Sequence, residues 1–221
     1  MTSGPSISLD QKARLHSPVL SDALDAVGLR NQALDPSIRP LDDSLVLMGR
    51  VRTGLYMEVF HVEAGENPYE LEMNLVDDLQ PGDVALLCCS GSKRITPWGE
   101  LLTTASIARG AAGCVTDGMV RDTRTIRQLQ FPVFHRGVSP LDAQGRGKVV
   151  AIDVPVECGG VKAVPGDIIF GDADGLVLIP AEAAEEVIAR AVAKVSQESN
   201  AREELRKGTL LRDVFSRHHV L

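Results

Sequence analysis

The sequence lacks any long hydrophobic run. Among its 221 residues, the longer uncharged apolar stretches, such as Val84–Cys89 and Leu176–Ile179, fall far short of the roughly 20 residues that cross a bilayer as a helix. Residues 1–20 also lack the basic start and the apolar run of a secretory signal peptide. We therefore expect a cytoplasmic protein without a membrane partner.

The sequence also lacks a stretch dense in lysine or arginine. It has 23 Lys and Arg against 30 Asp and Glu, so its formal net charge is −7. A nucleic-acid partner would need a basic patch, because contacts to phosphates supply most of the binding free energy for a nucleic-acid backbone. The composition therefore argues against nucleic-acid binding.

Cysteine and histidine are sparse and scattered, at four and five residues. No two cysteines form a Cys-x-x-Cys pair, and no two histidines lie four residues apart as metal ligands on one helix face would. This pattern argues against a disulfide framework, a zinc site or a histidine metal centre, and it favours small buried thiols. The residues concerned are Cys88, Cys89, Cys114, Cys158, His16, His61, His135, His218 and His219.

What is present is typical of one globular domain. With 44% hydrophobic and 24% charged residues, a chain of this length should bury roughly 70% of the surface that it exposes when unfolded. No clear linker or low-complexity segment divides it, so we expect a single α/β domain over residues 1–221. Its core covers about residues 18–180, and a C-terminal helix covers about residues 181–207.

The middle of the chain has the pattern of a βαβ unit. Pro81-Gly82-Asp83 precedes an apolar strand over Val84–Cys89, a helix follows over Glu100–Arg109, and a second apolar strand lies around Cys114–Thr116. A crossover of this kind makes the two strands parallel, so the loops that follow both strands emerge at one edge of the sheet. Open α/β sheets bind ligands at that edge.

The other expected elements flank this unit. Alternation over residues 48–60 predicts a strand with Val51, Thr53, Leu55 and Met57 on one face. Asp172-Ala173-Asp174-Gly175 departs from the calcium-loop pattern and favours a hairpin turn. Further helices are expected over residues 17–27, 69–79 and 181–207, and further strands over residues 131–135, 149–155, 167–170 and 176–179.

The helix expected over residues 181–207 carries a narrow apolar stripe. Its members are Val187, Ile188, Ala191 and Val195. A narrow stripe is typical of an outer or intersubunit helix. Because Val187, Ile188 and Val195 would stay partly exposed to solvent in a monomer, we expect a closed homo-oligomer that covers them.

Two polar segments fall at the shared edge of the βαβ unit. Gly99-Glu100-Leu101-Leu102 follows the first strand, and Arg121-Asp122 follows the second, with 20 residues between Glu100 and Arg121. The crossover brings together a helix N-terminus with free N–H groups, a guanidinium and two carboxylates. A small 2-oxo acid with a divalent metal would need these components. Taken singly, Arg121-Asp122 could be a solvated pair, and Glu100 could serve only the helix dipole.

These motifs together resemble the RraA-like family, which includes the class II 4-hydroxy-4-methyl-2-oxoglutarate/4-carboxy-4-hydroxy-2-oxoadipate aldolases and the regulators of ribonuclease E activity. The resemblance spans roughly residues 18–190, and the acidic-X20-Arg-Asp spacing is its most specific part. It implies an α/β/β/α sandwich related to swivelling β/β/α domains, with a C-terminal helical tail, assembled as a homotrimer or homohexamer. The motifs that carry it are Gly99–Leu102, Gly110–Asp122, Phe131–Phe134 and Pro165–Pro180.

The resemblance also implies roles for individual residues. Asp122 would ligate Mg²⁺ or Mn²⁺, and Glu100 would support the metal through water. Arg121 would hold the 2-oxo acid and its developing enolate, while the backbone amides of Leu101 and Leu102 take the carboxylate. The implied substrate-binding residues are thus Gly99, Leu101, Leu102 and Arg121, the catalytic ones are Arg121 and Glu100, and the metal ligands are Asp122 and, through water, Glu100.

Two positions depart from the aldolase pattern. Thr125 stands where the family usually has an acidic residue three positions after the Asp, and Asn67-Pro68-Tyr69 stands where an Asp-Asn pair is common. Both departures predict weaker metal binding and a different substrate. Trp98 is either a loop anchor or a wall of the substrate pocket, and Gly91-Ser92-Lys93 is expected to form a loop over the crevice.

We therefore expect a lyase that depends on a divalent metal. It would cleave a 4-hydroxy-2-oxo dicarboxylic acid of the 4-hydroxy-4-methyl-2-oxoglutarate type to pyruvate, with oxaloacetate decarboxylation as a side activity. The alternative is a non-enzymatic regulator that binds a ribonuclease through its acidic surface. A methyltransferase is disfavoured, since no Gly-rich cofactor loop follows a first strand.

Overall fold

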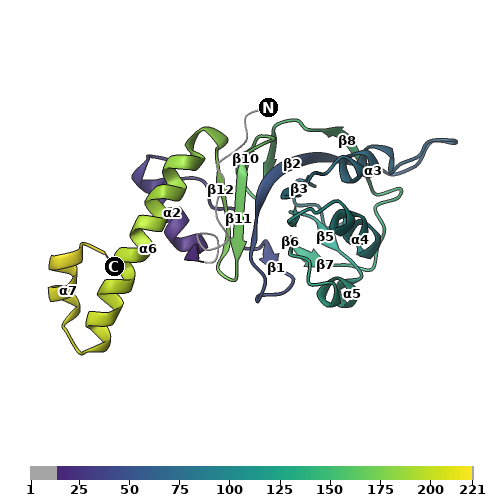
Figure 1. Ribbon diagram of the computed structural model, residues 1–221. Helices are drawn as coiled ribbons and strands as arrows, with labels where there is room; N and C mark the ends of the chain where they lie inside the picture. Colours follow the sequence, from purple (N-terminus) through teal and green to yellow (C-terminus); the bar gives the residue numbers. More distant parts are fainter. Residues whose placement is uncertain (1–13, 221) are drawn as a thin grey trace.

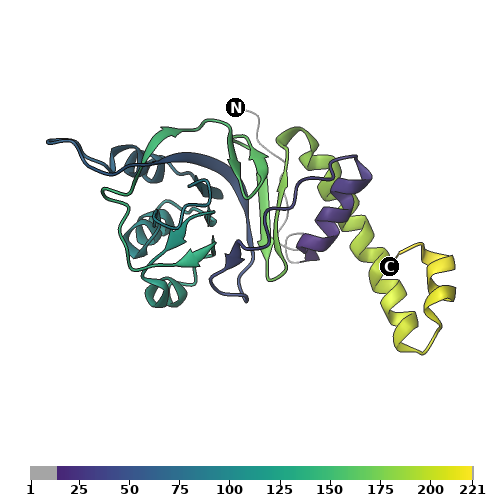
Figure 2. The same ribbon diagram turned by 180° about the vertical axis from the view of Figure 1, so that it is seen from behind.

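A computed structural model describes residues 14–220 of the chain (Figures 1 and 2). Its centre is a curved eight-stranded sheet with helices on both sides (Figure 1). The expected α/β architecture with C-terminal helices is confirmed. The hydrogen-bonded order is β1 (Arg39–Pro40), β6 (Val133–His135), β4 (Gly113–Thr116), β3 (Asp83–Cys88), β2 (Leu47–Glu58), β11 (Ile168–Asp172) and β12 (Gly175–Ile179), and β8 (Gly147–Ile152) pairs with β2.

The strands β2, β3, β4 and β6 run parallel to one another. The crossovers between them are the helices α3 (Glu70–Asp77), α4 (Glu100–Ala108) and α5 (Thr123–Gln128), which lie together beside the sheet in Figure 1. All six residues of β3 and all four of β4 are buried, which explains why Val84–Cys88 and Gly113–Val115 contain no charged residue. The predicted βαβ unit is confirmed, and the loops after β3 and β4 emerge at one edge.

Antiparallel pairs complete the sheet. The strand β11 pairs with both β2 and β12, and Asp172 faces Gly175 across the β11–β12 turn, so the predicted hairpin is confirmed. Two small sheets stand outside the main one. They are formed by β9 (Val156–Cys158) with β10 (Val161–Ala163), and by β5 (Met119–Val120) with β7 (Gly137–Val138).

The far side of the β11–β12 hairpin is covered by α2 (Ser17–Ala26) and α6 (Ala184–Arg206), the latter preceded by a short 3-10 turn, Ala181–Ala183. Val187 and Ile188 of α6 are 0% and 5% exposed in the single chain, and Val195 packs partly buried against the same cluster. The expectation that this stripe is exposed in a monomer was therefore wrong for Val187 and Ile188, because α2 lies over them, whereas Val195 is partly exposed as expected. The stripe gives no argument for an oligomer.

The C-terminal end of α6 projects from the body and is met by α7 (Leu211–His218) (Figures 1 and 2). His218 Nε2 lies 2.8 Å from Glu204 Oε1 of α6. His218 thus belongs to a helix that packs on α6.

The predicted face of β2 is correct only in part. Val51 and Leu55 pack in one cluster as expected, but Met57 is 51% exposed. A register shift between Leu55 and Tyr56 opposite β8 breaks the alternation, and Tyr56 is buried instead.

All four cysteines are free and buried, as predicted. Within residues 14–220, no helix combines the length and the apolar character that a membrane crossing requires. The expectation for residues 1–20 falls mostly on residues 1–13, which lie outside the described residues.

Candidate functional site

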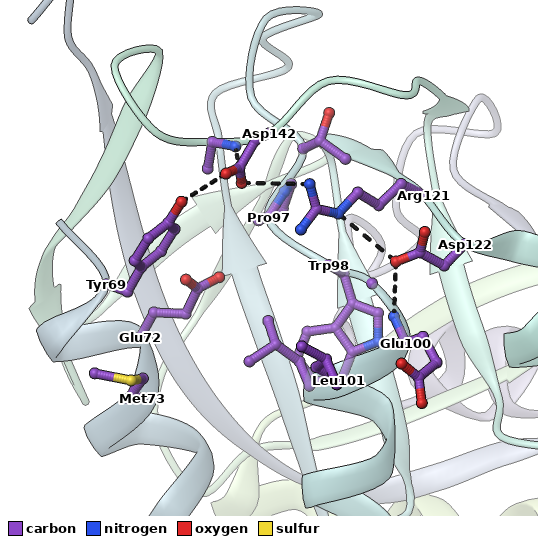
Figure 3. A pocket seen from close by; sticks show the side chains of 14 residues that line it. Tyr69, Glu72, Met73, Pro97, Trp98, Glu100, Leu101, Arg121, Asp122 and Asp142 are labelled. Carbon is purple, nitrogen blue, oxygen red and sulfur yellow. Dashed lines mark hydrogen bonds and ion pairs between the residues drawn. The ribbon is translucent and has the colours of Figure 1, made fainter.

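A cavity of about 320 Å³ lies where the loops after β3 and β4 meet α3 and α4 (Figure 3). The structure brings all of the sequence-predicted site residues to it. They are Gly99, Glu100, Leu101, Leu102, Arg121 and Asp122. The topology explains this, because the carboxyl ends of two adjacent parallel strands open at the same edge.

A short backbone contact joins the two predicted segments. Trp98 and Val120 form a parallel bridge, and the Arg121 N–H donates to the Trp98 carbonyl at 3.0 Å. A Cβ on Gly99 would lie 2.7 Å from Asp122 Oδ2, so only glycine lets the carboxylate come this close. Gly99 thereby allows Asp122 to reach the start of α4.

The Asp122 side chain lies at the N-terminus of α4, while its backbone stands at the N-cap position of α5 without a capping hydrogen bond from the side chain. Its Oδ2 accepts a 3.2 Å hydrogen bond from the Glu100 N–H, so the carboxylate faces the positive end of the α4 dipole. Its backbone adopts φ 57°, in the left-handed region that few non-glycine residues occupy. Strain of this kind persists where the surrounding structure enforces it and is often found at functional sites. The Asp122 side chain is 45% exposed, so it can meet a ligand.

Arg121 is held between two carboxylates. Its Nε lies 3.6 Å from Asp122 Oδ2, and its Nη1 lies 3.5 Å from Asp142 Oδ1 (Figure 3). Within the described residues, Nη2 has no ion-pair partner. A guanidinium has five N–H donors in a planar fork, so donors remain for a ligand after both contacts.

Asp142 is in turn held by the other wall of the cavity. The Tyr69 hydroxyl donates to Asp142 Oδ2 at 2.6 Å, and the Ala143 N–H donates to Oδ1 at 2.7 Å. Burial would raise the pKa of Asp142, but these two hydrogen bonds and Arg121 outweigh it and lower the pKa. Burial and the bond to Asp142 raise the pKa of Tyr69 to about 12. Asp142 therefore carries a negative charge that fixes Arg121.

Glu72 of α3 is a second acidic residue in the wall. It is 6% exposed, and the Tyr56 hydroxyl of β2 donates to its Oε1 at 2.5 Å. Burial away from water is the main reason why its pKa is raised to about 7, although the bond from Tyr56 lowers it. Figure 3 shows the Glu72 carboxyl pointing to the side of the cavity where Asp142 and Arg121 lie.

The Glu100 side chain is turned away from Asp122. Its Oε1 accepts a 3.0 Å hydrogen bond from Thr104, one turn further along α4, and Figure 3 shows the two carboxylates pointing apart. The backbone amides of Leu101 and Leu102 precede the first hydrogen bond of α4, from Thr103 N–H to the Gly99 carbonyl. These first-turn amides suit an anionic group.

The oxygen donors at the cavity fit a hydrated divalent cation. Within residues 14–220, no group of three or more His, Cys, Asp or Glu side chains could hold a metal ion. Mg²⁺, however, usually keeps several waters and binds through one or two carboxylates together with substrate oxygens. Asp122 supplies one such carboxylate, while Thr125 is exposed and adds no charge.

Two other sequence expectations have definite outcomes. Trp98 is a buried anchor that also lines the cavity, because its Nε1 donates to Thr103 Oγ1 at 2.9 Å and its ring stacks on Phe131. The loop with Gly91 was expected over this crevice, which was wrong. The Gly91 N–H donates to Asp117, and Gly91 borders a separate depression beside Arg136.

Sequence reasoning missed Tyr69, Glu72 and Asp142. Glu72 lies three residues before Leu75 and four before Val76, on the face that α3 buries, and this position was a usable signal. Asp142 lies in the loop before β8, where no periodicity predicts its direction.

The chain matches known proteins over most of its length. A family model described as RraA-like: Aldolase/RraA matches residues 17–178. A protein of Halalkalibacterium halodurans, whose name assigns it provisionally as a 4-hydroxy-4-methyl-2-oxoglutarate aldolase, is 36% identical over 175 residues, 79% of this chain and 77% of that protein.

Two solved structures share the fold. An uncharacterized protein from Pseudomonas syringae pv. tomato matches with a TM-score of 0.82 and 29% identity, over 95% of this chain and 98% of that one. Streptomyces coelicolor RraAS2, described as an unusual member of the RNase ES inhibitor RraA protein family, matches with a TM-score of 0.76 and 27% identity, over 91% and 99% of the two chains.

Proposed function

Because the chain belongs to the RraA-like (Aldolase/RraA) family, we propose that it is a lyase that breaks a carbon–carbon bond of a small 2-oxo dicarboxylic acid and releases pyruvate. The observation that carries this proposal is the placement of Arg121. Its guanidinium is fixed by Asp122 and Asp142 beside the first turn of α4, within one cavity. A group that must stabilise a developing oxyanion works best when it is already in position.

The two sides of this arrangement suit the two polar ends of a 2-oxo acid. The carboxylate would lie on the first-turn amides of Leu101 and Leu102, where the α4 dipole favours negative charge. The 2-oxo oxygen would then face the free donors of Arg121. A fork of this type meets a keto oxygen and a carboxylate oxygen together.

A divalent cation, Mg²⁺ or Mn²⁺, would be held by Asp122, with Glu100 able to reach its water shell after a change of rotamer. When bound, such an ion polarises the 2-oxo group and opposes negative charge that develops on it. The Glu100 N–H in the first turn of α4 keeps the Asp122 carboxylate oriented, so this metal ligand would be in position before the cation binds.

Retro-aldol cleavage and decarboxylation beside a 2-oxo group share one product, the enolate of pyruvate. Arg121 opposes the charge that appears on this enolate in the transition state. Removal of one such preorganised donor typically slows a reaction by about 10²–10³, equivalent to about 3–4 kcal/mol. The same residues would therefore support cleavage of a 4-hydroxy-4-methyl-2-oxoglutarate-type acid and decarboxylation of oxaloacetate as a side activity.

The decisive experiment measures pyruvate with coupled lactate dehydrogenase. A panel of 2-oxo acids, including 4-hydroxy-4-methyl-2-oxoglutarate and oxaloacetate, is offered with Mg²⁺, with Mn²⁺ and with EDTA. We expect turnover that requires the metal. A panel without any turnover that depends on the metal would refute the proposed function.

A non-enzymatic regulator of a ribonuclease is the second candidate. The observation that favours it is the structural likeness to RraAS2, which is described as a member of an RNase inhibitor family. Such a role does not need the Tyr69–Asp142–Arg121 network to face a cavity. Inhibition of a ribonuclease by the Asp122→Asn variant as strong as by the wild type, without lyase activity in either, would favour this candidate.

A further inference from the structure

We propose that Glu72 is the residue that moves the proton in this cavity, a role that rests on the proposed lyase function. The reaction needs a group that removes a proton from the substrate hydroxyl and one that protonates the enolate carbon. Arg121 and the amides of α4 stabilise charge but do not exchange protons near neutral pH.

The position of Glu72 suits proton transfer. Its side chain lines the cavity from α3, opposite the first turn of α4, and points into the region that Arg121 also faces (Figure 3). The Tyr56 hydroxyl donates a 2.5 Å hydrogen bond to Oε1 from the sheet side. This bond fixes the carboxyl group and leaves Oε2 with no hydrogen-bond partner among the described residues.

The groups that face Glu72 come from every neighbouring element. They are Tyr56 of β2, Cys114 of β4, Arg121 after β5, Asp142 of the loop before β8, and Tyr69 at the start of α3. Burial raises the pKa of Glu72 to about 7, Asp142 adds to the rise, and Tyr56 and Arg121 oppose it. Both the carboxylate and the carboxylic acid are therefore populated near neutral pH.

The neighbouring groups are poorer candidates. The hydrogen bonds from Tyr69 and Ala143, together with Arg121, lower the pKa of Asp142, so it is a weak base. The pKa of Tyr69 is raised to about 12, so its hydroxyl stays protonated. Burial raises the pKa of the Cys114 thiol well above its usual value, so it stays neutral.

With a 4-hydroxy-2-oxo acid, Glu72 would take a proton from the C4 hydroxyl and return it to C3. A Glu72 carboxylate oxygen accepts the proton of the C4 hydroxyl while the C3–C4 bond breaks. The O–H electron pair forms the new carbonyl of the leaving fragment, and the C3–C4 pair becomes the enolate. The Glu72 carboxylic acid then gives the proton to C3, which forms the methyl group of pyruvate and restores the carboxylate.

The test uses pyruvate itself, so it does not depend on the identity of the leaving fragment. In D₂O with Mg²⁺, proton NMR follows exchange of the pyruvate methyl hydrogens by the full-length wild type. We expect Glu72→Gln, which keeps the size of the side chain, to slow exchange by about 10²-fold or more, as loss of a general acid–base does. Glu70→Gln, on the exposed face of α3, is the matched control and should exchange within about twofold of wild type.

A pH profile separates proton transfer from a merely structural role. Exchange by the wild type should fall below pH about 7, as the carboxylate that removes the methyl proton is lost. Tyr56→Phe removes the hydrogen bond that lowers the pKa of Glu72. The pH below which exchange falls should therefore be higher in this variant than in the wild type.

Each outcome decides a different claim. Exchange by Glu72→Gln within about threefold of wild type overturns the role of Glu72 and leaves the proposed function standing. A wild type that neither exchanges pyruvate hydrogens nor releases pyruvate from 2-oxo acids overturns the proposed function. If Glu72→Gln does not fold, the pH profile of Tyr56→Phe is the test. Exchange that falls at the same pH in Tyr56→Phe as in the wild type refutes the role of Glu72.

Discussion

Glu72→Gln should remove a pH dependence from the stability of the fold. Glu72 is 6% exposed, and burial raises its pKa from 4.5 to about 7 in the folded chain. Between these two pH values the folded state binds the proton that the unfolded state has lost. Stability therefore falls as pH rises from about 4.5 to about 7, and the loss is complete above that range.

The size of the effect follows from the displacement of the pKa. The difference between about 7 and 4.5 is about 2.5 units, and each unit is worth about 1.4 kcal/mol, so ionisation of Glu72 costs the fold about 3 kcal/mol at pH 8. Glutamine cannot ionise and keeps an oxygen that accepts the Tyr56 hydrogen bond. The stability difference between variant and wild type should therefore shift by about 3 kcal/mol in favour of the variant between pH 4.5 and pH 8.

The assay is urea unfolding at a fixed protein concentration, followed by the fluorescence of Trp98, which is the single tryptophan and is 1% exposed. The other buried acids titrate equally in both proteins, so the difference isolates Glu72. Glu70→Gln serves again as the exposed control and should show no such shift. A variant-minus-wild-type difference that stays constant within about 0.5 kcal/mol from pH 4.5 to pH 8 would refute the assignment of a raised pKa.

Four further predictions concern the site and the assembly. Arg121→Lys keeps the charge but loses the fork, so kcat should fall by about 10²–10³, and steady-state kinetics within about threefold of wild type would exclude Arg121 from the mechanism. Asp122→Asn should fold normally and lose Mn²⁺ affinity, and calorimetry showing unchanged affinity would place the metal elsewhere. Gly99→Ala should push Asp122 off the start of α4, since the new Cβ would lie 2.7 Å from its Oδ2, so Mn²⁺ binding should weaken while thermal melting changes little. We still expect a homotrimer or homohexamer, and light scattering that shows a particle of 23.7 kDa at micromolar concentration would contradict this.

The parallel βαβ unit could be predicted from the sequence because its causes are local. An uninterrupted apolar run predicts a buried strand, Gly99 and Gly110 bound the helix between the two strands, and a crossover makes the strands parallel. Chain connectivity then places Gly99–Leu102 beside Arg121-Asp122, and the structure has them around one cavity.

The contacts that complete the site depend on the tertiary structure. Tyr69 and Asp142 are 73 residues apart in the chain, and no local pattern predicts their 2.6 Å hydrogen bond or the ion pair of Asp142 with Arg121. Likewise, the periodicity of α6 indicates that Val187 and Ile188 form an apolar stripe, but it cannot identify what covers that stripe. Both the intersubunit surface that we expected and the α2 helix found there satisfy the same pattern. Removal of apolar surface from water is favourable whichever element covers that surface. Only the long-range packing of the whole chain therefore decides which element covers the α6 stripe.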